Sequence, residues 1–173
     1  MRGTASYGLA PVGGVRTGFT KKYTDVPTSG GDGENDWIVL RYADVLLMYA
    51  ETVNEQGAIT APALDAVNRV IRRARGLPVA TANPATDLPL TTGTAALRAR
   101  LETERRLELN FEGHRWFDLV RTDRAIAVMN DYFVRYKIFN ASVPRTIDAH
   151  NRLFPLPLQE LQTNPALKQN DGY

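Results

Sequence analysis

The chain has 173 residues and a net charge of +2, from 21 Lys and Arg against 19 Asp and Glu, and it contains no cysteine. This length predicts one domain or at most two small ones, and the lack of cysteine excludes a disulfide scaffold, a thiolate zinc site and a cysteine nucleophile. The interleaved charges form no basic patch for nucleic acid, and no apolar run approaches the roughly 20 residues of a membrane span.

Residues 1–35 are rich in turn-forming residues and poor in apolar clusters. The segment 28–33 has the composition of a loop, and the preceding sequence is interrupted by Gly8, Pro11, Gly13, Gly14, Gly18 and Pro27. We therefore expect residues 1–35 to form an irregular loop or tail, and residues 36–173 to form the folded domain. The N-terminus also lacks the apolar stretch of a signal peptide.

A helical repeat of apolar residues begins after Asp36 and predicts a first helix over 37–56, capped by Asn35 or Asp36 and ended by Gly57. One face of this helix carries Val39, Leu46, Leu47 and Val53.

A second helix is predicted to follow closely. Thr60 is its expected N-cap, Pro62 suits the first turn and Gly76 ends it, while Asp65 and Arg69 stand at a pairing distance of four residues. The short connection to the first helix predicts an antiparallel helix hairpin.

Further helices follow a loop that is rich in Thr, Ala, Asn and Pro at 79–93. We expect helices over 94–111, where the leucines form no single stripe, over 114–120 and over 124–130, and one helical turn over 158–161. Residues 132–153 mix aromatic residues with breakers and have no clear pattern. On the third helix, Arg98 with Glu102 and Glu102 with Arg106 are spaced for ion pairs.

Four segments, in order, resemble the SusD/RagB family. They are Leu40–Glu51 (LRYADVLLMYAE), the next helix with its stop in Val67–Val70 (VNRV) and Arg73–Pro78 (RARGLP), Glu104–Arg121 (ERRLELNFEGHRWFDLVR), and the C-terminal set of FPLP, NP and QNDGY over 154–173. Single short motifs are weak signals, but four in the family order over 36–173 are specific.

The resemblance implies an all-α fold of tetratricopeptide-like antiparallel helix pairs with long irregular loops. It implies an outer-face lipoprotein of a Bacteroidetes-type outer membrane that captures an oligosaccharide or other nutrient, without catalysis, for a SusC-type TonB-dependent transporter. Members of this family are much longer and carry an N-terminal lipid-anchored cysteine, and membrane association through such an anchor is not encoded in these residues. We therefore interpret the chain as a C-terminal fragment of a SusD-like protein. In such a fragment the missing helix pairs no longer cover part of the face with Val39, Leu46, Leu47 and Val53, so we expect some apolar surface of this face to lie open.

The dense charges of the third helix allow two interpretations. Glu104, Glu108 and Glu112 follow one another at steps of four, and paired carboxylates can hydrolyse glycosides. However, arginines alternate with them, which is typical of ion-pair networks, so we expect Arg–carboxylate bonds that fasten this helix to neighbouring loops.

No other catalytic, metal or cofactor site is predicted. The two histidines, His114 and His150, have no metal-binding spacing, Asp32, Glu34 and Asp36 lack the glycine of a calcium loop, and no serine lies in a nucleophile elbow.

Aromatic residues outside the regular helical pattern are the candidates for ligand binding. We expect Trp116 and Phe117 to lie in the core, because they stand among apolar neighbours on a short helix. The candidate ligand-binding residues are Tyr7, Trp37, Tyr132, Tyr136 and Phe139. The alternative function is a helical scaffold domain that mediates protein–protein contacts.

Overall fold

The computed structural model describes residues 7–12, 15–20, 22–23, 35–136 and 145–173, and only the backbone of 7–12 and 15–19. The chain divides into two compact units, Met1–Arg115 and Trp116–Tyr173. In chain order, the elements are β1 (Tyr7–Val12), β2 (Val15–Thr20), α1 (Tyr42–Glu55), α2 (Ala61–Ala74), α3 (Thr94–Glu108), α4 (His114–Arg121), α5 (Ala125–Arg135), the 3₁₀ helix η3 (Ala149–Arg152) and α6 (Leu158–Thr163).

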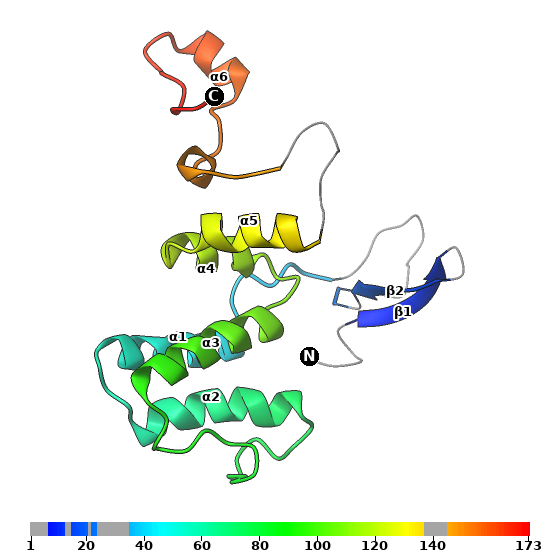
Figure 1. Ribbon diagram of the computed structural model, residues 1–173, viewed down its shortest axis with the longest axis vertical. Helices are drawn as coiled ribbons and strands as arrows, with labels where there is room; N and C mark the ends of the chain where they lie inside the picture. The colour runs from blue at the N-terminus through cyan, green and yellow to red at the C-terminus, as the bar shows by residue number, and fades with distance from the viewer. Residues whose placement is uncertain (1–6, 13–14, 21, 24–34, 137–144) are drawn as a thin grey trace. The chain divides into compact units, whose positions relative to one another are not determined.

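The first unit begins with an antiparallel hairpin of β1 and β2 (Figure 1). Its register pairs Val12 with Val15, so that only Gly13 and Gly14 separate the strands in the sequence. A glycine pair between two short strands is a strong hairpin signal, because such turns need positive φ angles. The prediction of an irregular segment over 1–35 is therefore wrong for these strands: the glycines separate two strands.

Helix α1 starts five residues later than predicted. Arg41 is extended, with φ −143° and ψ 161°, and stands at the N-cap position. The predicted cap Asn35 has another role, since its side-chain amide donates to the carbonyl of Tyr23 at 3.0 Å. The aromatic and branched residues of 37–40 favour extended backbone, which explains why the helix does not begin there.

The predicted hairpin of α1 and α2 is confirmed. The hydroxyl of Thr60 accepts a hydrogen bond from the backbone N–H of Ala63 at 3.3 Å, and Pro62 lies in the first turn. Gly57 and Gly76 follow the two helices with φ of 78° and 71°, a conformation that glycine adopts without steric cost.

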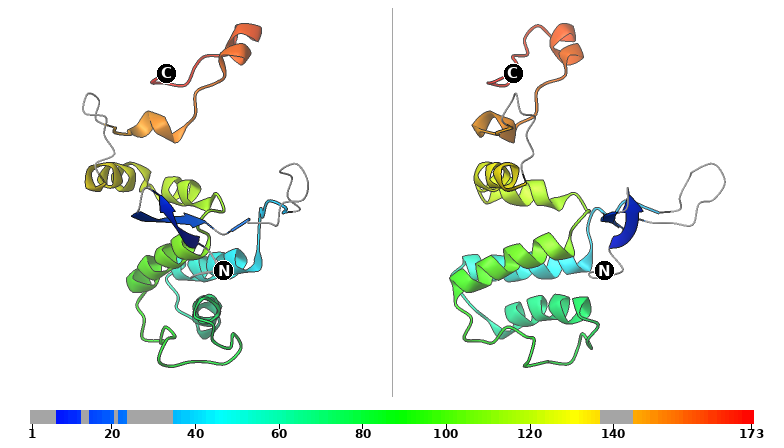
Figure 2. Two further views of the ribbon diagram at one scale, coloured as in Figure 1. Left: turned by 90° about the vertical axis from the view of Figure 1, so that its right-hand side faces the viewer. Right: turned by 45° about the vertical axis from the view of Figure 1, so that its right-hand side comes forward.

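Helices α1, α2 and α3 surround the main hydrophobic core (Figures 1 and 2). The fully buried members include Leu47 from α1, Ile71 from α2 and Leu97 from α3. The expected all-α class of tetratricopeptide-like helix pairs is thus confirmed, with the β1–β2 hairpin in addition.

The prediction of an open face on the first helix is wrong for Leu47, which is buried, and for Leu46 and Val53, which pack against the core. Of the four residues of this face, only Val39 is exposed.

The loop after α2 is fastened to that helix by side chains. The amide of Asn68 bonds both backbone groups of Leu88: it accepts from the N–H at 2.7 Å and donates to the carbonyl at 3.2 Å. This arrangement imitates a strand partner, and we call it an amide clamp. Arg72, which is buried, also binds Asp87 through both carboxylate oxygens. Arg72 binds Asp65 as well, at 3.1 Å, so Asp65 does not pair with Arg69 as predicted.

The second unit uses the same clamp twice. Asn130 of α5 bonds the N–H and the carbonyl of Ile147, at 2.8 and 2.9 Å, and Gln169 bonds those of Leu156, at 2.7 and 3.0 Å. Helix α5 is longer than predicted, ending at Arg135.

Further bonds to backbone carbonyls hold the C-terminal residues. The side chain of Asn170 donates to the carbonyl of Phe154 at 2.6 Å, and the hydroxyl of Tyr173 donates to that of Leu153 at 2.9 Å. Gly172 has φ 93°, and a Cβ there would lie 2.6 Å from the His150 ring. The C-terminal QNDGY sequence therefore forms a set of bonds that hold the proline-rich stretch before α6.

Candidate functional site

An exposed aromatic pair lies in the extended segment before α1. Trp37 stacks on Tyr23, with ring centroids 5.1 Å apart and planes inclined by 10°. Trp37 is nevertheless 61% exposed. Gly113 borders the ring: a Cβ at this position would lie 3.4 Å from Cζ2 of Trp37, and its φ of 81° favours glycine. The unit therefore presents a supported indole with a free surface.

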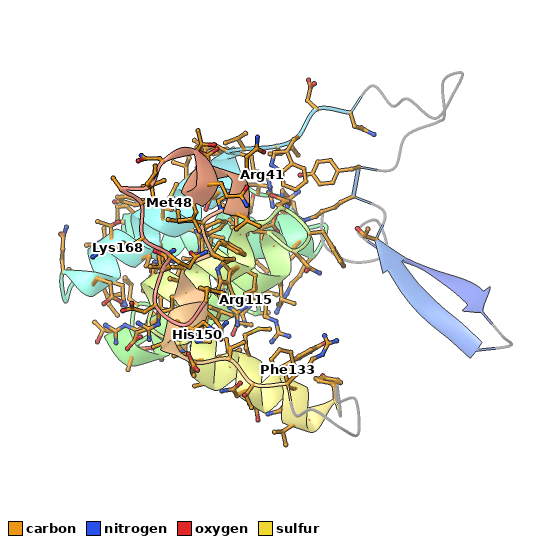
Figure 3. All side chains as sticks on the ribbon, turned by 90° about the horizontal axis from the view of Figure 1, so that it is seen from above. Arg41, Met48, Arg115, Phe133, His150 and Lys168 are labelled. Atoms are coloured by element: carbon orange, nitrogen blue, oxygen red, sulfur yellow. The ribbon has the colours of Figure 1, made fainter. Side chains whose placement is uncertain are left out.

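Ion pairs fasten this segment to the end of α3. Arg41 binds the Glu112 carboxylate with two bonds, from Nε at 2.7 Å and from Nη2 at 3.0 Å, and it also reaches Glu108 at 2.8 Å. Lys22 binds Glu112 at 2.5 Å and the backbone carbonyls of Glu108 and Asn110. Figure 3 labels Arg41 at the start of α1. The expectation that arginines fasten the third helix to neighbouring loops is confirmed.

The electrostatics of this cluster favour the charged forms. Burial by itself raises the pKa of Glu112, but the hydrogen bonds from Arg41 and Lys22 outweigh it, and the pKa lies below its usual range. Burial lowers the pKa of Arg41, and the bonds to Glu112 and Glu108 more than reverse this. Glu108 is fully buried and also binds Arg73. The glutamates thus serve as anchors in ion pairs.

Other arginines of α3 form ion pairs with residues of another helix. Arg105 binds Asp44 of α1 at 2.7 Å, and both side chains are buried. Arg98 forms two bonds with Glu55 of α1, and Glu102 is 3.5 Å from Arg115. The pairs predicted from spacing within the helix are thus replaced by bonds that join α3 to other elements.

A second aromatic cluster lies on α5. The rings of Tyr132 and Tyr136 are 4.7 Å apart, and that of Phe133 is 6.3 Å from Tyr132. Tyr132 is 41% exposed and Tyr136 63% exposed. These residues follow one another at the four-residue spacing of neighbours on a helix face.

The structure places the predicted ligand residues in separate groups. Trp37 belongs to the first unit, and Tyr132 and Tyr136 belong to the second. Tyr7 is the first residue of β1, but its side chain is outside the described part, and Phe139 lies outside the described residues altogether. Sequence reasoning missed Tyr23, because nothing in its local pattern indicates that it stacks on a residue fourteen positions away.

The prediction that Phe117 is a core residue is wrong, because its side chain is 68% exposed. Trp116, the other residue of this prediction, is half-buried. On α4 the buried positions are instead Asp118 and Leu119, so the helix turns Phe117 away from its buried face.

Comparison with known proteins identifies the family of this chain. The family model described as the SusD family matches residues 5–173. The chain is 38% identical over 152 residues to the SusD-like protein P38 of Formosa agariphila, and 35% identical over 150 residues to SusD-like protein P2 of the same organism. The chain therefore belongs to the SusD family.

Solved structures support the same assignment. A SusD homolog from Bacteroides thetaiotaomicron has a TM-score of 0.61 and 30% identity over 84% of this chain, and a SusD superfamily protein from Parabacteroides distasonis has 0.59 and 30% over 84%. The chain covers 30% and 29% of these structures. The match with P38 includes 88% of this chain but only 27% of P38, and the match with P2 includes 84% of this chain and 27% of P2.

Among the residues that the structure describes, no helix is both long and apolar enough to cross a membrane. Among the same residues, no group of three or more His, Asp or Glu side chains is arranged to hold a metal ion.

Proposed function

We propose that this chain is part of a nutrient-capture protein of a SusC/SusD-type uptake system. The family match over residues 5–173 is the observation that carries this proposal. The protein binds an oligosaccharide or other nutrient at the outer face of the outer membrane, held there by a lipid anchor, and passes it unchanged to a SusC-type TonB-dependent transporter. The chain spans only 27% of the length of P38, so we propose these properties for the whole protein on the basis of the family match.

Trp37 is the first proposed ligand contact. The face of an indole offers dispersion and CH–π contact to the apolar face of a sugar ring. Stacking on Tyr23 supports one side of the indole, and the Lys22 and Arg41 ion pairs fix the chain on both sides of the pair. A ring held in this way loses little side-chain entropy on binding, which favours ligand capture.

Tyr132 and Tyr136 are the proposed contacts of the second unit. Their adjacent rings combine an apolar face with a hydroxyl group, which suits a ligand that carries both CH groups and hydroxyls. Tyr7 and Phe139 remain proposed members of the binding set by their residue type alone.

Calorimetric titration tests this proposal. The chain is titrated with neutral hexasaccharides of glucose, xylose and mannose, first as the parent and then with Trp37→Ala. We expect the substitution to weaken binding about tenfold, equivalent to about 1.4 kcal/mol. Phe117→Ala is the matched control, since it removes another exposed aromatic ring, and it should leave the affinity unchanged. Equal affinities of the parent and both Trp37 and Tyr136 alanine variants would contradict the aromatic site.

A helical scaffold for protein contacts is the second candidate function. It is favoured by exposed apolar residues at helical spacing on α1, namely Val45, Met48 and Tyr49. A Met48→Glu variant should abolish capture of a protein partner if this face is the interface. If capture is unchanged in this variant, the α1 face is not the interface. If the parent captures no protein partner while it binds the saccharide, the scaffold function is excluded.

A further inference from the structure

A cleft of about 260 Å³ lies between α1 and α2, and neither Trp37 nor Tyr23 lines it. Its floor is apolar and consists of Ala43 and Leu46 from α1, Val70 from α2 and Val79 from the following loop. Ligand pockets typically measure about 300 to 1,000 Å³ and combine an apolar lining with a few polar groups. The volume of this cleft lies just below that range, which suits a single ring.

Three arginines line the same cleft, namely Arg41, Arg69 and Arg73. Arg41 and Arg73 share the carboxylate of Glu108, and Arg41 also binds Glu112. Lys22 binds Glu112 as well. The carboxylates of Glu108 and Glu112 are thus shared by three cations, and Arg69 is a fourth cation beside them. The surroundings of the cleft are therefore cationic.

The nearby carboxylates of α1, α2 and the loop after α2 are bound elsewhere. Asp44 binds Arg105, and both Asp65 and Asp87 bind Arg72. Asp44, Asp65 and Asp87 therefore do not neutralise the positive charge of the arginines that line the cleft.

Arg69 is the arginine of the cleft without an acidic partner. Among the described residues, no carboxylate lies within ion-pair distance of it. Its guanidinium instead lies over the ring of Tyr42, 5.7 Å from the centroid, and its Nη1 is 3.5 Å from the tyrosine hydroxyl. This cation–π contact orients the planar guanidinium without neutralising its charge. A guanidinium positioned in this way can form two parallel bonds with an oxyanion.

We propose that the α1–α2 cleft binds an anionic monosaccharide unit, whose carboxylate or sulfate group pairs with Arg69 while its ring packs on the apolar floor. This inference rests on the proposed nutrient capture and names a charged class of ligand and a separate subsite for it. The volume admits one ring, the floor supplies apolar contact, and the uncompensated charge selects the anion. An acidic side chain of a partner protein could pair with Arg69, but it would leave the apolar floor of the cleft without a ring to pack on it.

The test compares three ligands of equal ring size on the full 173-residue chain. Methyl glucuronide carries a carboxylate, glucose 6-sulfate carries a sulfate ester, and methyl glucoside is the neutral control. Binding is followed by NMR shifts of the backbone amides of α1 and α2 and by calorimetry. We expect at least one anion to bind about tenfold more tightly than methyl glucoside, and its affinity to fall as salt is raised from about 0.01 to 0.15 M.

Two variants assign the effect to Arg69. Arg69→Gln should abolish the preference for the anion. Since Arg69 forms no ion pair with a described residue, the variant should keep the melting temperature of the parent. Arg98→Gln removes the same charge from an exposed pair with Glu55 outside the cleft and should keep the preference. Tyr42→Phe, which retains the ring, should also keep it.

Several results would overturn the inference. These are equal affinity for charged and neutral rings, an anion preference that survives in Arg69→Gln, inorganic sulfate that binds as tightly as glucose 6-sulfate, or amide shifts that lie outside α1 and α2. An acidic peptide that displaces the sugar acid at a lower concentration would assign the cleft to a protein partner instead. Binding of neutral hexasaccharides at Trp37 does not depend on Arg69, so the inference can fail while the proposed function stands.

Discussion

The three-helix core and the C-terminal residues 145–173 are stabilised in different ways. Helices α1, α2 and α3 bury a continuous set of aliphatic side chains, including Leu47, Ile71 and Leu97. In contrast, neither η3 nor α6 contains a buried residue. The C-terminal stretch is held instead by side-chain bonds to the backbone, above all the clamp of Gln169 on Leu156.

This difference shows how one small protein can carry both a rigid scaffold and long loops. Burial of aliphatic side chains is non-directional and contributes about 1.5 to 3 kcal/mol for each fully buried residue. A clamp contributes less, since each hydrogen bond has a net value of about 1 kcal/mol, but it specifies one partner. The same device joins the loop after α2 to that helix through Asn68, where Leu88 also packs against the core.

Breaking the ion pairs of Arg41 should give the largest effect on the scaffold. Arg41→Ala leaves Glu108 and Glu112 buried with fewer partners, and loss of one member of a buried pair costs about 3 to 5 kcal/mol. The free energy of unfolding in urea measures this loss. The control Arg98→Ala removes an exposed arginine and should leave the urea midpoint unchanged; equal losses in both variants would mean that burial of the pair does not matter.

The clamp of the core should give an intermediate effect. Asn68→Ala removes two hydrogen bonds to Leu88 and should lower the free energy of unfolding by about 2 kcal/mol. Asn110→Ala is the control, because the exposed side chain of Asn110 makes no hydrogen bond with a described residue. If Asn68→Ala matches this control in urea unfolding, the clamp does not stabilise the core.

The same ion pairs predict how stability depends on pH. Because the pKa of Glu112 is lower in the folded state than its ordinary value of 4.5, its contribution is complete above that value and is lost as the pH falls through the folded-state pKa. The parent should therefore lose stability below about pH 4.5, whereas Glu112→Gln should be less stable at pH 7 and change less on acidification. Parallel curves for the two proteins would exclude Glu112 as a source of the acid sensitivity.

The smallest effect on global stability is expected from Gln169→Ala. The clamp on Leu156 should open locally, so amide exchange should become faster over 153–173 while the melting temperature stays unchanged. The control Gln162→Ala lies on exposed α6 and should not alter exchange. A fall in the melting temperature equal to that of Asn68→Ala would mean that both regions unfold together and that the contrast between them is wrong.

Local signals in the sequence predicted much of the helical scaffold. Thr60 and Gly76 act within one helical turn of their own positions, so their roles as cap and stop could be recognised from the sequence and are confirmed. The signal of the hairpin is also local, but the prediction of an irregular tail treats Gly13 and Gly14 as breakers, whereas they separate two strands.

Long-range contacts could not be predicted in the same way. Arg98 lies four residues before Glu102, yet it binds Glu55, which is 43 positions away and becomes its neighbour only when α3 packs on α1. Trp37 was identified as a candidate ligand contact, but its support by Tyr23 depends on how the segment before α1 is fastened to α3. Residue type thus indicated the candidate, and tertiary packing determined its geometry.

The most direct test of the central claim, that the chain binds a saccharide through Trp37 without altering it, is an NMR titration of the Trp116→Phe variant. Trp37 is then the only indole, and its N–H signal reports on the exposed ring. With the hexasaccharide that binds most tightly, we predict a saturable shift of this signal and recovery of the hexasaccharide intact. An unchanged indole signal at saturating ligand, or recovery of shortened products, would contradict the account.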